Sequence, residues 1–130
     1  MNLARVAIAL LIATVAGCGG GSALNPKFQP QVTNQPDNFQ FQSTGVTSVT
    51  QTLQYTWQNS GTMANVNQAT TVTGGTATLT IRDAAGTQVY TANMSANGTF
   101  VTNAGTTGAW TIQVTLTNFS GTINFRVQKH

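Results

Sequence analysis

The segment from residue 109 to residue 119, AWTIQVTLTNF, alternates between apolar and polar side chains. Trp110, Ile112, Val114 and Leu116 occupy one parity, and threonine and glutamine fill the other. Successive side chains of a β-strand point to opposite faces, so a period of two predicts a strand with one buried and one solvent-exposed face. A chain built from such segments has to bury the apolar face of each strand against another layer.

The same alternation recurs from Phe39 to the C-terminus. The predicted strands are FQFQ (39–42), VTQTLQYTWQN (49–59), TATLTIRD (76–83), TQVYTANM (87–94), GTFVT (98–102) and TINFRVQ (122–128). A further stretch, Asn65–Thr73, is weaker because only Val66 and Val72 are large and apolar. It predicts a poorly packed edge strand.

Clusters of glycine, asparagine, serine and aspartate separate these segments. Asn59-Ser60-Gly61 is predicted to end one strand, and Gly74-Gly75 is predicted to break another. Asp83–Gly86 suits a type I turn that closes on a glycine bulge. Asn97-Gly98 is the strongest hairpin signal in the chain. Asn118–Gly121 is predicted to reverse the chain between its last two strands.

Seven or eight short strands with regularly spaced turns predict a single antiparallel β-sandwich, of jelly-roll or immunoglobulin-like type, over residues 38–130. The composition agrees, because charged residues make up only 5% of the chain and the helix formers Glu, Lys and Arg are few, whereas hydrophobic residues reach 40%. The predicted core consists of Leu53, Tyr55, Trp57, Leu79, Ile81, Trp110, Ile112, Val114, Leu116, Ile123 and Phe125.

The beginning of the chain has a different character. Met1–Arg5 carries a positive charge, and Val6–Ala16 is a continuous apolar run. This run is too short to span a bilayer, which requires about 20 residues. A positive start, a short apolar centre and small residues at the end together predict a secretory signal peptide over residues 1–17.

The predicted signal peptide is followed directly by the single cysteine of the chain, Cys18. Val15-Ala16-Gly17-Cys18 resembles the lipobox of bacterial lipoproteins, with valine in place of the commoner leucine at its first position. The resemblance implies cleavage between Gly17 and Cys18, diacylglycerol on the cysteine sulfur and acylation of the new amino group. It places the protein in the bacterial cell envelope, anchored to the membrane through the lipid on Cys18.

Two other readings of Cys18 stay open, namely ordinary secretion with a free thiol and a cysteine that lines a core. Glycines on both sides argue against the core, and an exposed thiol is a liability in an exported protein. Gly19 is not the aspartate that marks inner-membrane retention in enteric lipoproteins. The outer membrane is therefore the predicted location if the host is Gram-negative.

Residues 18–37 are predicted to form the lipidated cysteine and a flexible tether. Three glycines follow Cys18, and Pro26, Pro30 and Pro36 are the three prolines of the chain. No apolar periodicity appears, so the composition is that of a linker. An extended segment of this length reaches roughly 60 Å at about 3.3 Å per residue.

Residues 108–127, GAWTIQVTLTNFSGTINFRV, resemble the last strand pair of bacterial pre-peptidase C-terminal domains and of the P domains of proprotein convertases. The shared features are a glycine, an aromatic residue, alternating aliphatic residues, a small-residue turn and a final strand. The resemblance implies a jelly-roll-like sandwich and carries no functional residues across.

The residues that usually perform catalysis are scarce. The two carboxylates are Asp37 and Asp83, and the single histidine is the final residue, His130. Paired-carboxylate hydrolysis, a Ser–His–Asp arrangement and a metal centre each need more groups than these. We therefore predict no enzymatic activity, no metal and no cofactor.

The formal net charge is +3, but the five cations are spread along the chain rather than clustered. Nucleic-acid binders cluster lysine and arginine on one face, so nucleic acid is not a predicted partner.

Three kinds of binding fit the sequence. The wet faces are rows of Thr, Gln and Asn that can bind sugars beside an exposed aromatic ring, for which Tyr90 is the candidate. The weak strand Asn65–Thr73 can pair with a partner strand if its edge is open. Thr76, Thr78 and Thr80 form a short row similar to flat ice-binding arrays.

The predicted function is thus a membrane-anchored envelope lipoprotein with a non-catalytic binding or structural module. Two alternatives stay open. One is an accessory or inhibitor domain that acts on an envelope enzyme, and the other is a carbohydrate-binding module. The partner is accordingly the membrane together with an envelope protein or a glycan.

Overall fold

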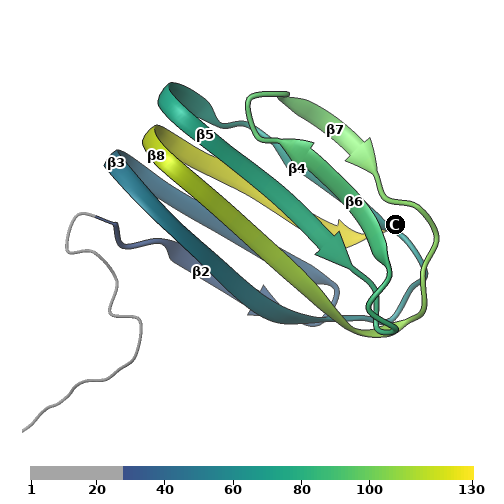
Figure 1. The fold of residues 1–130 in the computed structure, drawn as a ribbon. Coiled ribbons are helices and arrows are strands. Elements are labelled where there is room, and N and C mark those ends of the chain that lie inside the picture. Colours follow the sequence, from purple (N-terminus) through teal and green to yellow (C-terminus); the bar gives the residue numbers. More distant parts are fainter. Residues whose placement is uncertain (1–27) are drawn as a thin grey trace, which may run out of the picture.

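The computed structural model describes residues 28–130, which form an all-β domain (Figure 1). All of its strand pairs are antiparallel, and this part of the chain contains no helix. The predicted antiparallel β-sandwich of seven or eight strands is thereby confirmed, with seven strands in residues 28–130. The strands are β2 (Gln31–Gln35), β3 (Asn38–Asn59), β4 (Ala64–Gln68), β5 (Thr71–Arg82), β6 (Gln88–Asn93), β7 (Gly98–Val101) and β8 (Gly108–Lys129).

The sandwich is one continuous sheet that folds over on itself. β3 and β8 are 22 residues long and pair with each other along both of their halves. One half of this pair continues through β2, β4 and β7 to make a five-stranded layer. The other half continues through β5 and β6 to make a four-stranded layer. Figure 1 shows the two layers stacked face to face, with β3 and β8 running through both.

The fold-over lies at a corner, which we define as residues 43–51 of β3 and 116–123 of β8. The pairing register shifts three times between Ser43 and Gln51, as expected for β-bulges that bend a strand pair. Where the hydrogen bonds between the two backbones are interrupted, side-chain oxygens accept bonds from the free amides. The amide of Ser48 donates to Oγ of Ser120 at 2.9 Å, and the amide of Asn118 donates to Oγ1 of Thr50 at 2.9 Å.

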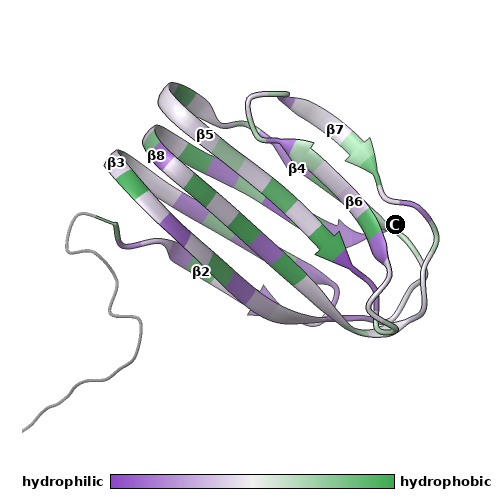
Figure 2. Ribbon diagram, viewed as in Figure 1, coloured by the Kyte–Doolittle hydropathy of each residue, from purple (hydrophilic) through white to green (hydrophobic). Residues whose placement is uncertain are grey.

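The core fills the space between the layers, and bands of apolar and polar residues alternate along the strands in Figure 2. Two aromatic contacts anchor it. Phe41 and Phe125 stack with ring centroids 5.2 Å apart, and Trp57 meets Trp110 edge to face at 6.0 Å. Nine of the eleven predicted core residues are buried, whereas Leu53 and Tyr55 are only half-buried.

Leu53 and Tyr55 are partly open because they lie on the outermost strand of the four-stranded layer. The segment Gln51–Asn59 of β3 has β8 on one side only, since β2 pairs solely with residues 38–42. No neighbouring strand of the described chain covers its other side. The prediction that these two side chains are fully buried was therefore wrong, although both pack against the core.

The structured domain begins earlier than the predicted boundary at residue 38. Phe28 is fully buried, and β2 lies inside the predicted tether and pairs with β3. Trp57 fixes the end of β2 by donating its indole N–H to the carbonyl oxygen of Gln35 at 3.0 Å. The tether prediction was wrong for residues 28–37, and its remaining part lies outside the described residues.

Two predicted strand ends and one predicted hairpin do not occur. Gly74-Gly75 lies within β5, and Asn118–Gly121 lies within β8, where each strand passes the corner. Asn97-Gly98 does not join a hairpin, because β6 pairs with β5 whereas β7 pairs with β4. The Asn97 amide group instead pairs with the backbone of Thr70, accepting at 2.8 Å and donating at 3.0 Å.

Two other turn predictions are confirmed. β3 ends at Asn59, as the Asn-Ser-Gly signal indicated. Asp83–Gly86 forms the turn between β5 and β6, in which the Gly86 amide donates to the Asp83 carbonyl oxygen at 3.0 Å.

Candidate functional site

The outer surface of the five-stranded layer is dominated by side-chain amides. We call it the amide face. Its nine Asn and Gln residues are Gln31, Gln35, Asn38, Gln40, Gln42, Asn65, Asn67, Asn124 and Gln128. They occupy the parity opposite to buried residues such as Phe39 and Phe125, so the strand alternation directs them away from the core.

One row of the amide face crosses all five strands. Thr33 pairs with Gln40, Gln40 with Arg126, Arg126 with Asn67, and Asn67 with Thr99. Directly opposite residues in a sheet have Cβ atoms about 4.5–5.5 Å apart. The row is therefore a continuous line of hydrogen-bonding groups with one positive charge at its centre.

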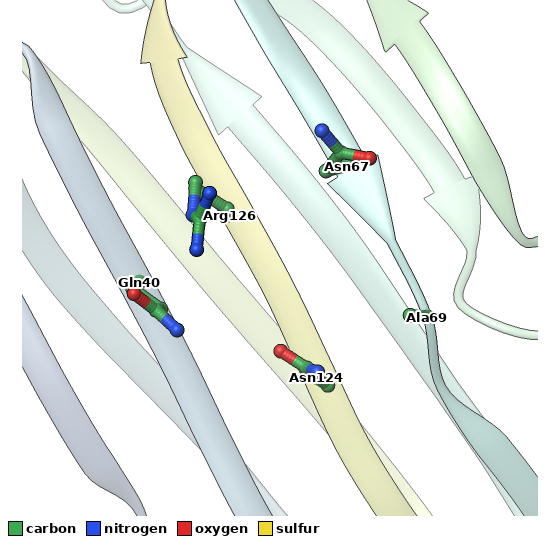
Figure 3. Close-up of a pocket in the computed structure, with 5 residues that line it drawn as sticks. All are labelled: Gln40, Asn67, Ala69, Asn124 and Arg126. Carbon is green, nitrogen blue, oxygen red and sulfur yellow. The ribbon is translucent and has the colours of Figure 1, made fainter.

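The amide face is hollowed beside Arg126 (Figure 3). A shallow groove of about 260 Å³ is lined by Gln40, Asn67, Ala69, Asn124 and Arg126. Arg126 and Asn124 come from β8 and lie between Gln40 on β3 and Asn67 on β4. Ala69 follows β4, and its amide donates to the Asn124 carbonyl oxygen at 2.9 Å. The hollow forms there because alanine presents only a methyl group.

No carboxylate of residues 28–130 forms an ion pair with Arg126, and its side chain is exposed. Both aspartates of the chain are engaged elsewhere. Asp37 accepts from the amide and the hydroxyl of Ser60, at 2.7 and 2.8 Å. Asp83 accepts from backbone amides of its own loop and of Thr106. The groove is thus a cationic spot on an otherwise neutral face.

Tyr90, the predicted ligand-binding aromatic, points into the sandwich rather than out of it. It pairs in register with the buried Ile81, and its ring lies 6.4 Å from that of Phe100. Its hydroxyl donates to Oε1 of Gln68 at 2.7 Å. Partial burial raises the pKa of the Tyr90 hydroxyl. Tyr90 therefore bridges the two layers, and only part of its ring is available to a ligand.

The predicted row of Thr76, Thr78 and Thr80 is part of a wider array on the outer face of the four-stranded layer. Thr78 pairs with Thr115, which pairs in turn with Thr52. Thr56, Thr91 and Thr111 lie on the same face. The Thr80 and Thr91 hydroxyls are 3.2 Å apart and hydrogen bonded, so part of this array is satisfied internally.

The prediction of an open edge at Asn65–Thr73 was wrong for residues 65–68. Residues 65–68 of β4 pair with β8 on one side and with β7 on the other, whereas Thr71 and Val72 of β5 pair with β8 alone. The segment Gln51–Asn59 of β3, like β2, β6 and β7, has a strand partner on one side only within residues 28–130. Two groups reach its outward carbonyls, the Asn34 side chain at Thr56 and the Asp37 amide at Gln58.

Asp83 organises the loops at one end of the sandwich. Its carboxylate accepts from the amides of Thr87 and Thr106 at 2.8 Å and from that of Ala85 at 3.0 Å. The bond from Thr106 contributes most to lowering the pKa of this carboxyl, and burial opposes the shift. These contacts make Asp83 a structural residue that joins the β5–β6 turn to the loop before β8.

The lowered pKa of Asp83 predicts acid sensitivity. A carboxyl whose pKa is lower in the folded state stabilises the fold above its ordinary value of 3.8, and this stabilisation is lost as the pH falls through the folded-state pKa. We expect the melting temperature to be flat near neutral pH and to fall below about pH 4. Asp83→Asn should melt lower at pH 7 and lose less on acidification. If the melting temperature of Asp83→Asn depended on pH in the same way as that of the wild type, the role of Asp83 would be contradicted.

The lipid-anchoring residues Gly17 and Cys18 lie outside the described residues. Within residues 28–130, no group of three or more His, Cys, Asp or Glu side chains is arranged to hold a metal ion. The same range contains no helix of the length and hydrophobicity needed to cross a membrane.

Comparison with known proteins gives no match, either to a protein-family model or to a curated protein. The candidate site therefore depends on its own geometry. The sequence pattern indicated that polar rows line the strands, but it missed Gln40, Asn67, Ala69, Asn124 and Arg126 as a group. Only the strand order brings these five residues together.

Proposed function

We propose that this chain is a membrane-anchored envelope lipoprotein whose β-sandwich is a non-catalytic module that binds glycans on its amide face. The observation that carries the proposal is the row of Gln40, Arg126 and Asn67 beside the groove. An amide group both donates and accepts hydrogen bonds, as a sugar hydroxyl does. A flat face of such groups can follow a polysaccharide chain without burying unsatisfied polar atoms.

The character of the amide face favours a glycan over a protein partner. Protein interfaces are enriched in aromatic and other large apolar residues at their centre. The large apolar residues exposed in residues 28–130 are Val32 and Val101, and neither lines the groove. A hydrophilic polymer such as a polysaccharide needs less apolar surface at its binding site than a protein partner does.

The alternative function, an accessory or inhibitor domain for an envelope enzyme, has its own support. The carbonyl oxygens of Thr56 and Gln58 point away from β8 and accept hydrogen bonds there. Because the backbone of a strand alternates, the N–H and C=O groups of Thr52 and Gln54 point to the same open side. An edge of this kind can accept a strand from another protein. A partner captured by this edge would be lost in Thr52→Pro.

A glycan array probed with the mature lipoprotein in detergent micelles distinguishes the two functions. Glycan binding predicts signal on a subset of polysaccharides, and competition by the free polysaccharide should remove it. Absence of signal at high protein concentration would contradict the glycan proposal. Capture of one envelope enzyme, lost in Thr52→Pro, would then favour the accessory function.

The lipid anchor is tested independently of the ligand. Cys18→Ser removes the sulfur that carries diacylglycerol, and we expect the unprocessed or secreted chain to leave the lipidated membrane pool. Two or three acyl chains hold a protein firmly, whereas one chain gives only marginal binding. Membrane fractionation and the mass of the mature N-terminus measure the change. A variant that is still cleaved and membrane-bound would contradict the lipoprotein assignment.

A further inference from the structure

We propose that the groove around Arg126 binds the carboxylate of an acidic saccharide, such as a uronate residue within a polysaccharide. The inference rests on the proposed glycan-binding function and specifies its ligand. It is carried by the charge of the groove and by the direction in which its amide groups point.

Arg126 differs from the other described cations. Arg82, on the outer face of the other layer, donates to Oε1 of Gln113 at 3.4 Å. Lys129 lies close enough to Asp37 to help lower the pKa of that carboxyl. Arg126 has no such partner within residues 28–130, although it stands at the centre of the amide face. A planar guanidinium in this position is suited to a carboxylate, which it can bind through two parallel hydrogen bonds.

Two of the three amides that line the groove, those of Gln40 and Asn67, turn donors toward Arg126, whereas Asn124 turns its oxygen toward β3. The Thr99 hydroxyl donates to Oδ1 of Asn67 at 2.9 Å, which leaves the Asn67 amino group for the groove. Figure 3 shows this nitrogen on the side of Arg126, and it shows the Gln40 nitrogen turned toward β8. Two amide N–H groups therefore flank the guanidinium. A cluster of donors selects a ligand that presents acceptor oxygens, which a carboxylate does better than a neutral hydroxyl.

The size and charge of the groove favour a sugar acid over a phosphate group. Pockets for drug-sized ligands span about 300–1,000 Å³. A groove of about 260 Å³ suits one saccharide unit with the polymer continuing along the face. One guanidinium matches the single charge of a carboxylate. A phosphate monoester, with close to two charges at neutral pH, is better served by several cations.

The test compares three immobilised polymers by biolayer interferometry, with the full mature lipoprotein in detergent micelles. The probes are polygalacturonate, its methyl ester and dextran. The ester keeps the sugar and removes the negative charge. We expect the acid form to bind at least about tenfold more tightly than the ester, since a hydrogen bond to a charged group contributes about 1.5–3 kcal/mol. Binding should weaken as salt is added.

Arg126→Gln should abolish the preference for the acid form, and Arg82→Gln is the matched control, with a cation removed from the other layer and no expected change. Because the Arg126 side chain is exposed, its replacement should not destabilise the fold. Equal melting temperatures of the two variants would verify that both are folded. Equal affinity for acid and ester, insensitive to Arg126→Gln, would overturn the carboxylate site and leave glycan binding standing. If the protein bound none of the three polymers and no glycan on the array, both the carboxylate site and the glycan-binding function would be overturned. Stronger competition by inorganic phosphate than by galacturonate would assign the groove to phosphate.

Discussion

Trp110→Ala is expected to lower the free energy of unfolding by about 3–5 kcal/mol. The Trp110 side chain is fully buried, and its ring meets Trp57 edge to face at 6.0 Å. Its indole N–H donates to the carbonyl oxygen of Thr106 at 2.7 Å. The substitution therefore opens a cavity, removes an aromatic pair and leaves a carbonyl without its donor. Urea denaturation followed by circular dichroism measures the loss.

This loss is large because domains of this size have total stabilities of about 5–15 kcal/mol. The matched control is Thr111→Ala, one residue further along the same strand on the outer face, where we expect a loss below about 1 kcal/mol. Similar denaturation midpoints for the two variants would contradict the burial of Trp110. Because Trp110 sits in the pattern that first predicts the sandwich, the comparison tests the sequence argument as well as the packing.

The alternating pattern predicted which face of each strand is buried, but it did not predict where the chain reverses. Asn118 and Gly121 have positive φ angles of 47° and 138°. Such angles occur in tight turns and also in bulges that bend a continuous strand. The difference lies in the partner strand, because β3 carries matching irregularities between Ser43 and Gln51. A local signal contains no information on that distant segment, so the bend was taken for a turn.

β2 escaped prediction for a related reason. Its five side chains are all exposed, and Val32 is its single aliphatic residue. An edge strand that contributes backbone hydrogen bonds rather than a buried face leaves no apolar alternation in the sequence. Pro30 and Pro36 lie just outside β2, where proline is tolerated, yet they gave the segment the composition of a linker.

The sequence predicted which types of side chain line the strands, but not which of them come together in the candidate site. Each strand shows its own wet row of amides and threonines, but the rows become a face through strand order. Thr33 and Thr99 stand at opposite ends of one row although they are far apart in the sequence. The order β2-β3-β8-β4-β7 depends on long-range pairing and on the corner, neither of which has a local signature. Arg126 consequently looked like one scattered cation rather than the centre of a groove.

The corner should be the most sensitive part of the backbone, and Gly121→Ala is expected to cost more than about 3 kcal/mol. Gly121 has a φ of 138°, a conformation that L-residues rarely adopt, and such strain costs about 1–3 kcal/mol. A Cβ atom built there also collides with the carbonyl oxygen of Thr71 on β5. Relieving that collision means moving β5 away from β8, an overpacking cost of about 1–3 kcal/mol more.

Gly45→Ala separates the two contributions. Gly45 belongs to the same corner and has a φ of 63°, but a Cβ atom there meets nothing within 4 Å. We expect this control to lose only the conformational cost, about 1–2 kcal/mol. Thermal and urea denaturation of both variants provide the comparison. If Gly121→Ala were no less stable than Gly45→Ala, then β5 would not pack against the bend of β8. The two layers would in that case be held together by the core alone, with no contribution from a tightly fitted corner.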